Sequence, residues 1–312
     1  MASANATETK QGHRITPLQS ILLRLWQNPN ARLGGAIVCL MVALAILVPL
    51  LDAGYDPSRD RNLRARYAEP DCLIGWGLRT LEGEWSCDHP FGADKLGRDI
   101  LRRVGHGMST SLRVGVFVVI IATSVGSLIG LLAGFLGGWF ESIAMRIVDI
   151  LLAFPALLLA IALVSMRGAG LMNAMYAIAI TQIPIFARLA RSMAISLRSS
   201  EYVLAARSLG ASEFRLLSAH VFPNSLAPLI VQATLLLGTA VVETAALGFL
   251  GLGQQPPAPE LGKMLAESQQ SLQSGKWWVM FFPGITIVTI VLGFNLLGDA
   301  LRDALDPRLR GQ

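Results

Sequence analysis

The chain has 312 residues, of which 53% are hydrophobic and only 15% are charged, and its mean hydropathy is +0.53. This composition excludes an ordinary soluble domain and predicts a membrane protein. The formal net charge of +5 comes from basic groups that flank apolar runs. We therefore interpret these groups as signals of membrane orientation and expect no nucleic-acid partner.

Long apolar runs predict the membrane crossings. Four runs of at least 19 residues contain no Asp, Glu, Lys or Arg, namely 33–51, 114–140, 168–187 and 277–298. Two further runs, 143–166 and 226–251, carry only one or two charges each. Because about 20 apolar residues cross a bilayer as a helix, the sequence predicts an all-α polytopic protein with six transmembrane helices that contact membrane lipid.

The positions of the basic residues predict the orientation. They gather in the N-terminal tail, in the loop near residues 188–215 and at the C-terminal end. The positive-inside rule places all three in the cytoplasm, which requires an even number of spans. The first apolar run starts late and lacks a small-x-small cleavage site, so we expect an uncleaved helix rather than a signal peptide. Residues 17–27 are expected to form an interfacial helix before it.

A long loop follows the first span and lies outside in this orientation. It contains Cys72 and Cys87, which are either a disulfide or two free thiols, because sequence alone does not give their separation. Its end, residues 89–115, repeats apolar side chains at i+4 and carries acid–base pairs at i,i+4, among them Asp94–Arg98 and Asp99–Arg103. These features predict an amphipathic helix that lies on the outer membrane surface or contacts a partner there.

The second and third predicted spans contain packing and charge signals. Gly126 and Gly130 form a G-x-x-x-G pair, which favours close helix packing, although glycine is common in such spans. In the third span, Arg146 and Asp149 lie one turn apart and are expected to pair with each other. Pro155 is expected to kink this span.

The stretch 199–223 is too polar to lie in lipid. Ser199 or Ser200 can cap a first short helix, Gly210 can end it, and Ser212 can cap a second helix. Phe222–Pro223 is expected to close the segment, because a residue before proline is disfavoured in the helical region. Such a bent, half-apolar element is either a plain connector or a part that docks into a groove on a soluble partner.

The fifth span is expected to start after Pro228 and to place Glu243 towards its outer end. A carboxylate there must face the bundle interior or a water-filled cavity, where it either lines a path through the bundle or bonds to a neighbouring helix. Residues 248–265 contain several glycines and prolines and predict an ordered outer loop. Trp277 and Trp278 are expected at the outer membrane interface.

The stretch 199–223 resembles the cytoplasmic "EAA" loop of bacterial ABC-importer permeases. That loop reads E-A-A, three residues, G, nine residues, I, one residue and L-P, and this chain matches its alanines, glycine and proline in register. Leu204, His220 and Phe222 replace the glutamate, isoleucine and leucine. In the family this loop is the coupling helix of the ATPase contact. The resemblance implies coupling residues at Tyr202, Ala205, Ala206, Arg207, Gly210, Ala211, Phe214 and Pro223.

Three other stretches extend the resemblance over residues 89–310. HPFGADKLGRD is similar to a signature near the second span of the dipeptide and oligopeptide group, with Ala93 in place of a threonine. AALGFLGLGQQPPAPELGKML and FNLLGDALRDALDPRL resemble the C-type permease subunit of dipeptide importers. Similar sequences occur in subunits for oligopeptides, glutathione and nickel, so the resemblance does not select one substrate within this group.

The resemblance implies a fold like that of type I ABC-importer permeases and a place in the bacterial inner membrane. The implied partners are a homologous permease, two ATP-binding subunits and a periplasmic or lipid-anchored solute-binding protein. The expected division of the chain is a cytoplasmic tail, a first span, a periplasmic loop, a permease core and a C-terminal cytoplasmic tail. Their bounds are 1–31, 32–52, 53–111, 112–300 and 301–312.

No catalytic constellation is visible in the sequence. It lacks the G-x-x-x-x-G-K-[ST], G-x-S-x-G and H-E-x-x-H patterns, so we expect no cofactor, no metal and no enzymatic activity in this chain. ATP hydrolysis is expected in the partner subunits. The residues expected to line the path or gate are Glu243, Asp149 and Arg146. A less favoured alternative is an ion-coupled secondary transporter, which usually places ionisable groups or broken helices at mid-membrane.

Overall fold

The computed structural model describes residues 23, 25–70 and 89–305, and these residues are almost entirely helical. Cys72, Cys87 and residues 17–22 and 24 of the expected interfacial helix lie outside the described residues. The elements are α2 (Pro29–Leu51), η1 (Leu63–Ala65), α4 (Ile100–Leu136), α5 (Gly138–Leu152), α6 (Ala156–Arg167), α7 (Leu171–Arg198), α8 (Glu201–Ser208), α9 (Glu213–Leu216), η2 (Leu217–Val221), α10 (Phe222–Phe249), α11 (Leu261–Gln273) and α12 (Trp278–Leu305).

The number of membrane-length helices agrees with the sequence prediction. Five helices of the described chain are long and apolar enough to cross a membrane, if the continuous helix from Glu213 to Phe249 is counted as one. A sixth crossing is formed if α5 and α6, which are bent by 92° at their junction, make one span. Pro155 stands as the N-cap of α6, so the expected kink is a complete break.

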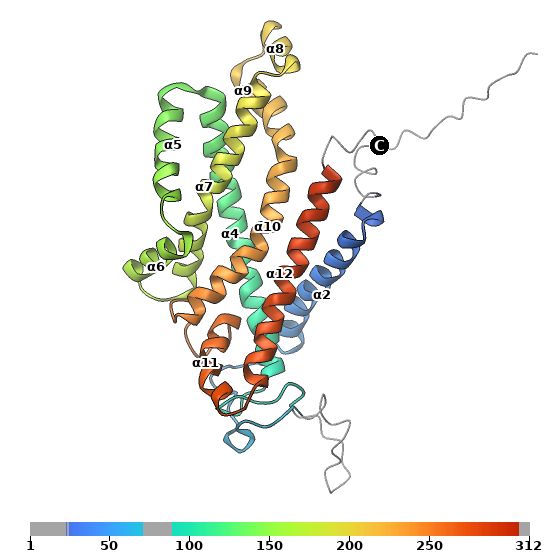
Figure 1. The fold of residues 1–312 in the computed structure, drawn as a ribbon, viewed down its shortest axis with the longest axis vertical. Coiled ribbons are helices and arrows are strands. Elements are labelled where there is room, and N and C mark those ends of the chain that lie inside the picture. The colour runs from blue at the N-terminus through green and yellow to red at the C-terminus, as the bar shows by residue number, and fades with distance from the viewer. Residues whose placement is uncertain (1–22, 24, 71–88, 306–312) are drawn as a thin grey trace, which may run out of the picture.

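The helices form an elongated bundle with two different ends (Figure 1). Helix α4 packs most extensively against α7, and α10 packs against α4, α7 and α12. Helices α2 and α12 lie together on one side, and α5 and α6 flank α7 on the other. Helix α8 projects at one end of the bundle, called here the α8 end. Helix α11 and the turn 89–99 lie at the opposite end, called the α11 end.

Three glycines of α4 permit its close contact with α7. A Cβ added to Gly126 would lie 2.6 Å from the carbonyl oxygen of Ile183, and one on Gly130 would lie 2.1 Å from that of Ala187. At Gly134 the corresponding distance, to the carbonyl oxygen of Arg191, is 2.6 Å. Real side chains cannot occupy such positions without moving the backbone. The close packing predicted from the G-x-x-x-G pair is therefore confirmed, and it extends one turn further.

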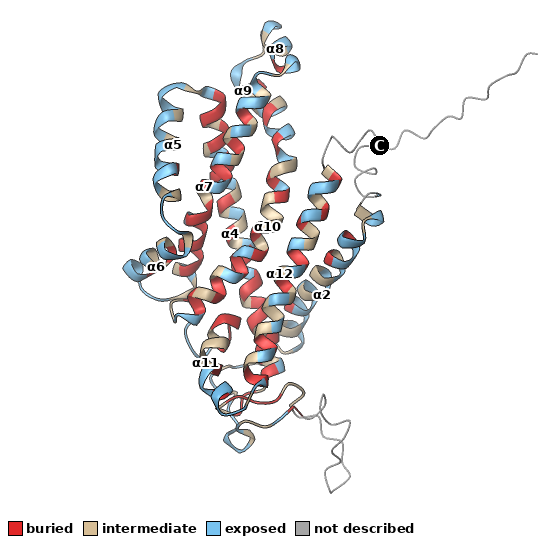
Figure 2. Ribbon diagram, in the orientation of Figure 1, coloured by how far each residue is buried: buried red, intermediate tan, exposed pale blue. Residues whose placement is uncertain are grey.

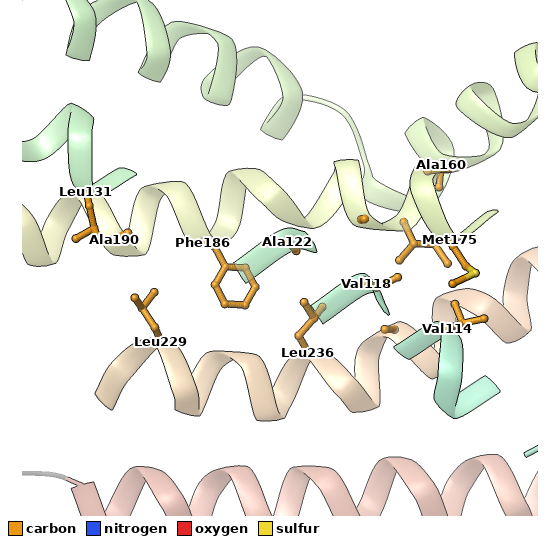
Figure 3. Packing of buried hydrophobic residues seen from close by; sticks show 14 of the residues in the cluster. Val114, Val118, Ala122, Leu131, Ala160, Met175, Phe186, Ala190, Leu229 and Leu236 are labelled. Atoms are coloured by element: carbon orange, nitrogen blue, oxygen red, sulfur yellow. The ribbon is translucent and has the colours of Figure 1, made fainter. Parts of the chain in front are cut away.

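Two apolar clusters hold the bundle together. In the larger one, Phe186 of α7 lies between α4 and the side chains of Leu229 and Leu236 on α10 (Figure 3). The second cluster joins α2, α4, α11 and α12 around residues such as Ile100 and Trp278. Helices α2, α5 and α6 are mostly exposed along their outer faces (Figure 2), as expected for surfaces that would face lipid or another subunit.

The amphipathic helix predicted over residues 89–115 is wrong in its first half. Residues 89–99 form a compact turn that contains Gly92 and Gly97, both with positive φ, and α4 begins only at Ile100. A Cβ on Gly97 would lie 1.7 Å from the carbonyl oxygen of Asn62, so the turn fits tightly against the segment that follows α2. Residues 89–99 are packed into the protein instead of lying on its surface, because their charged side chains pair within the protein.

The expected boundaries around the fifth span also need correction. Phe222 has helical φ and ψ of −57° and −51°, and the helix continues through Pro223 and Pro228. A π-helical turn, η2, precedes Pro223, and there the N–H of Phe222 bonds to Leu217 O instead of a carbonyl four residues back. A π-helical turn shifts the backbone carbonyl with which the Pro223 ring would otherwise clash. The helix therefore continues through this proline.

The outer loop predicted over residues 248–265 is shorter than expected. Helix α10 extends to Phe249, and α11 begins at Leu261. Trp277 is exposed as predicted for an interfacial residue, but Trp278 is buried, and its indole N–H donates to Ala93 O at 3.4 Å. The spacing of apolar residues in the sequence did not distinguish Trp277 from Trp278. It does not show that only Trp278 faces the second cluster.

Candidate coupling surface and buried polar sites

The segment between α7 and α10 is a helical hairpin with a defined turn. Gly210 has a φ of +83°, and its N–H bonds to Arg207 O at 3.0 Å. The N–H of Ala211 bonds to Ala206 O at 3.1 Å. These two bonds and the left-handed glycine form a Schellman motif, which ends α8 and satisfies its last carbonyls. The break predicted at Gly210 is confirmed, and the left-handed backbone of the motif explains the glycine at this position.

Ser212 starts the second helix as predicted. Its side chain accepts a hydrogen bond from the Arg215 N–H at 3.4 Å, which caps α9. At the start of α8 the expectation is only partly met. Ser200 occupies the N-cap position, but its hydroxyl donates to Leu197 O at 2.6 Å instead of capping a helix N–H. The first helix therefore begins without a side-chain cap.

One side of the hairpin is anchored in the bundle. Val203, Leu216 and Val221 are fully buried in the larger apolar cluster, with Ala206 and Ala211 packed against it. Arg198, at the end of α7, donates to Phe135 O at the end of α4 at 3.0 Å. These contacts join the hairpin to α4, α7 and α10, so we expect it to move with those helices rather than as a loose loop.

The other side of the hairpin presents apolar side chains with no cover. Leu209 is 88% exposed and Phe214 is 80% exposed, and Leu204 is also exposed. We call these three side chains the apolar tip. Charged groups surround them, including Glu201 and Arg215. A segment with these charges lies in water, so lipid does not account for the exposure of the apolar tip.

The remaining predicted coupling residues are distributed over both sides of the hairpin. Arg207 forms a bidentate ion pair with Glu213, with N···O distances of 3.1 and 2.9 Å. Tyr202 is exposed, and its ring lies 6.2 Å from that of His220. Ala205 and Pro223 are exposed. The structure thus brings Tyr202, Arg207, Gly210 and Phe214 into one small element at the α8 end.

Glu243 lies between helices, as predicted. Its Oε1 accepts a hydrogen bond from Gln182 Nε2 of α7 at 2.8 Å, and Gln182 is itself buried. The second carboxylate oxygen is buried and has no hydrogen-bond partner within the described residues. The bond to a neighbouring helix agrees with the structural alternative for this residue.

The predicted pair between Arg146 and Asp149 is not formed. Asp149 instead bonds to Arg188 of α7, with an Nη2–Oδ1 distance of 2.7 Å, and both side chains are more than half exposed. Arg146 is exposed on α5 and has no ion-pair partner in the described part of the chain. One helical turn places Arg146 and Asp149 near each other, but α7 offers Asp149 a partner that the spacing within one helix could not reveal.

Sequence reasoning did not find the charge cluster at the α11 end. Arg98 and Arg103 are only 4% and 2% exposed. Arg98 bonds to Asp94 at 2.6 Å and to Glu267 of α11 at 2.7 Å, and Arg103 lies 3.2 Å from Glu267. The predicted pair Asp94–Arg98 is therefore formed, within a turn rather than a helix. Asp99 caps α4 and bonds to His89 at 3.2 Å instead of pairing with Arg103.

A second group of charges connects the end of α2 to α4. Asp52 accepts two hydrogen bonds from Arg102 and lies 3.1 Å from His106 Nε2. The bond from Arg102 holds the pKa of Asp52 below its ordinary value, whereas burial raises the pKa of nearby Asp60. His106 also stacks on Tyr55, with ring centroids 4.2 Å apart. These contacts give His106 a structural role at the junction of α4 and the segment after α2.

Glu260 is a fully buried carboxylate that begins α11. It accepts the N–H groups of Gly262 and Lys263 at 2.9 and 2.8 Å and the hydroxyl of Ser111 at 3.4 Å. A Cβ added to Gly248 would lie 2.0 Å from its Oε2. Glu260 thus links the start of α11 to Ser111 of α4 and packs against Gly248 at the end of α10. Burial raises its pKa, and the backbone bonds oppose that change.

The helical bundle and the hairpin between α7 and α10 together define a class: a polytopic helical membrane protein with a polar hairpin that is anchored in the bundle and exposes an apolar tip. The sequence profile described as "Binding-protein-dependent transport system inner membrane component" matches residues 126–311. A second profile, "N-terminal TM domain of oligopeptide transport permease C", matches residues 16–70. The chain belongs to the family of inner-membrane permease components of binding-protein-dependent ABC transport systems.

Curated relatives match nearly the whole chain. The dipeptide transport system permease protein DppC of Alkalihalophilus pseudofirmus is 46% identical over 95% of this chain and 91% of its own length. The di/tripeptide permease DppC of Pseudomonas aeruginosa is 44% identical over 93% of each chain. The glutathione permease GsiD of Pectobacterium atrosepticum is 40% identical, covering 95% of this chain and 92% of its own.

Solved structures support the fold. The MetNI methionine ABC transporter in inward-facing conformations matches with a TM-score of 0.55 at 19% identity, over 65% of this chain and 97% of the matched chain. A second crystal form of the same transporter gives a TM-score of 0.51 at 20% identity. The similarity confirms the expected fold of an ABC-importer permease.

Proposed function

We propose that this chain is one half of a heterodimeric permease in the bacterial inner membrane, and that it couples to two ATP-binding subunits through residues 199–223. The observation that carries the proposal is the apolar tip, because exposed Leu204, Leu209 and Phe214 stand on a charged element outside the apolar spans. An amphipathic helical element of this kind docks into an apolar groove of a soluble partner. The rest of the assembly is a homologous permease and a periplasmic or lipid-anchored solute-binding protein.

The α8 end is proposed to face the cytoplasm. Arg191, Arg198, Arg207 and Arg215 lie in or near the hairpin, as the positive-inside rule requires of a cytoplasmic segment. Figure 1 also supports a common side for the two termini, because the start of α2 and the end of α12 both point towards the α8 end. In this orientation α11 and the buried charge cluster lie at the periplasmic face.

The proposed substrate class is dipeptides and short peptides. The named relatives transport dipeptides, di- or tripeptides and glutathione, according to their names, and all of these are short peptides. Dipeptides are preferred because the identities of 46% and 44% extend over 95% and 93% of this chain, whereas glutathione permeases are 40% identical over 95% or 47% identical over 72%. The solute-binding protein would make most of the selection, and the permease would provide the path.

The proposed mechanism is alternating access driven from the hairpin. Residues Glu213–Phe249 form one continuous helix, so a displacement of α9 by the ATPase would be transmitted along α10. Glu243 would keep α10 and α7 together at the gate through Gln182. The exposed polar sector of α5, with Arg146 and Asp149, would line the water-filled path, because charges are otherwise costly at membrane depth.

Uptake in cells tests the proposal directly. A strain that lacks this chain should lose uptake of a radiolabelled dipeptide, and the wild-type chain should restore it. Restoration should fail with Phe214→Asp, although this variant should reach the membrane in normal amount. Mass spectrometry of the ligand bound to the partner solute-binding protein would identify the peptide. Normal dipeptide uptake without this chain would refute the proposed function.

A further inference from the structure

We propose that the Arg207–Glu213 ion pair is a strap that holds α8 and α9 at a fixed angle and thereby sets the spacing of Leu209 and Phe214. The inference rests on the coupling role proposed above. It assigns Arg207 and Glu213 as positioning residues inside the hairpin and leaves contact with the ATPase to the apolar tip. The same pair could in principle bind the partner directly, and its geometry argues against that.

Helices α8 and α9 meet at the short turn 209–212, and the strap crosses this turn. The Schellman motif at Gly210 fixes the end of α8, and the Ser212 cap fixes the start of α9. Arg207 lies in the last turn of α8 and Glu213 in the first turn of α9. A cation and an anion are favoured at these respective helix ends, so each partner is stabilised in its position before the pair forms.

The side chains of Arg207 and Glu213 point towards each other. Arg207 donates from Nε and Nη2 to the two carboxylate oxygens of Glu213, at 3.1 and 2.9 Å. This bidentate geometry is the strong form of an arginine–carboxylate contact, and it turns the Nε–Nη2 edge of the guanidinium and both carboxylate oxygens towards each other inside the hairpin. The side chains are 37% and 58% exposed, so salt should weaken the strap. Leu209 and Phe214 flank the strap and are the more exposed groups.

A charge-reversal cycle in the full reconstituted complex tests the strap. Arg207→Glu or Glu213→Arg alone should lower the ATPase activity stimulated by the loaded binding protein at least five-fold. The double variant should return it to within about three-fold of the wild type, because the pair re-forms with reversed charges. Arg302→Glu is the matched control, since exposed Arg302 lies in the last turn of α12, outside the hairpin, and forms no ion pair in the described part of the chain, and it should change activity less than two-fold.

Hydrogen exchange gives a readout that does not depend on coupling. Each single reversal should speed exchange in the peptide spanning residues 207–216 about ten-fold, and the double variant should restore it. The strap is refuted if the single variants leave exchange and activity unchanged. It is also refuted if they lower activity without a change in exchange and the double variant does not recover, because the two side chains would then contact the ATPase directly.

A further variant, Phe214→Asp, distinguishes failure of the strap from failure of the coupling role. Phe214→Asp should abolish stimulation if the apolar tip docks on the ATPase. If exchange responds to the reversals as expected while Phe214→Asp leaves stimulation unchanged, the strap is supported and the coupling role is refuted.

Discussion

Gly210 adopts a φ of +83°, and a Cβ added there would meet nothing within 4 Å. Any effect of a substitution therefore comes from the backbone and not from a clash. Gly210→Val should cost about 1–3 kcal/mol locally, because a β-branched residue is strained in the left-handed region. We expect lower dipeptide uptake with normal amounts of protein in the membrane. Gly210→Asn is the matched control, since asparagine tolerates this region. Wild-type uptake in Gly210→Val would contradict the prediction.

Glu243 tests whether a buried carboxylate serves structure or transport. Glu243→Gln keeps an oxygen that accepts the Gln182 bond and should be tolerated. Glu243→Ala leaves the buried Gln182 amide unpaired, at a cost of about 1–3 kcal/mol, and should lower assembly or raise basal ATPase activity. Uptake assays with cationic and neutral dipeptides decide between the roles. A selective loss of cationic uptake in Glu243→Gln would favour solute contact instead.

Local chemistry was predictable at the residue scale, and partners distant in sequence were not. The glycine break and the Ser212 cap depend on residues close together in the chain, and both were predicted correctly. Asp149 was assigned to Arg146 because both lie on one helix, but its partner is Arg188 of α7. The Gln182 partner of Glu243 was missed for the same reason, because helical spacing says which residues share a face and not which helix packs against that face.

At the scale of the element, the α4–α7 contact depends on glycine. A Cβ on Gly130 would lie 2.1 Å from Ala187 O, so even Gly130→Ala should push the helices apart and cost about 1–3 kcal/mol. Thermal unfolding of the purified protein in detergent measures the loss. Gly35→Ala in α2 is the matched control, because its Cβ would meet nothing within 4 Å. Equal melting temperatures for the two variants would contradict the proposed packing.

Helix boundaries were the least predictable property of the elements. The prolines at 223 and 228 suggested that the fifth span starts after them, yet α10 contains both. The π-helical turn η2, which precedes Pro223, has no clear sequence signal, since it depends on how the hairpin is anchored in the bundle. Likewise the turn 89–99 has helical spacing of apolar residues, but Gly92 and Gly97 and the buried pairing of Arg98 determine its backbone.

On the scale of the whole molecule, the buried charge cluster fastens α11 to the segment before α4. Arg98 bonds to both Asp94 and Glu267, residues from distant parts of the chain. Arg98→Ala would leave buried Asp94 without its main partner and remove one of the two arginines that contact half-buried Glu267, and it should destabilise the protein by about 3–5 kcal/mol. The melting temperature in detergent reports this change. Arg59→Ala, which removes an exposed pair with Asp56, should cost under about 1 kcal/mol. Similar losses in both variants would contradict a structural role for the cluster.

The general architecture followed from the sequence, because apolar runs and charge asymmetry act over whole helices. Six spans were predicted, and the residues that the structure describes contain five membrane-length helices plus the bent pair α5–α6. The arrangement of the helices was not predictable from periodicity. The contact of α2 with α12, which joins the two ends of the chain, depends on Gly34 and Gly293, where an added Cβ would lie 2.7 Å from the facing helix.

The central claim is that the apolar tip contacts an ATP-binding subunit, and site-specific photocrosslinking tests it most directly. A photoreactive phenylalanine analogue at position 214 of the assembled transporter should crosslink to the ATP-binding subunit. The same analogue at Leu158 of α6, which is exposed and apolar but lies outside the hairpin, should not. A crosslink to the ATP-binding subunit from position 214 alone would support the account. No such crosslink from position 214, or an equal one from position 158, would contradict it.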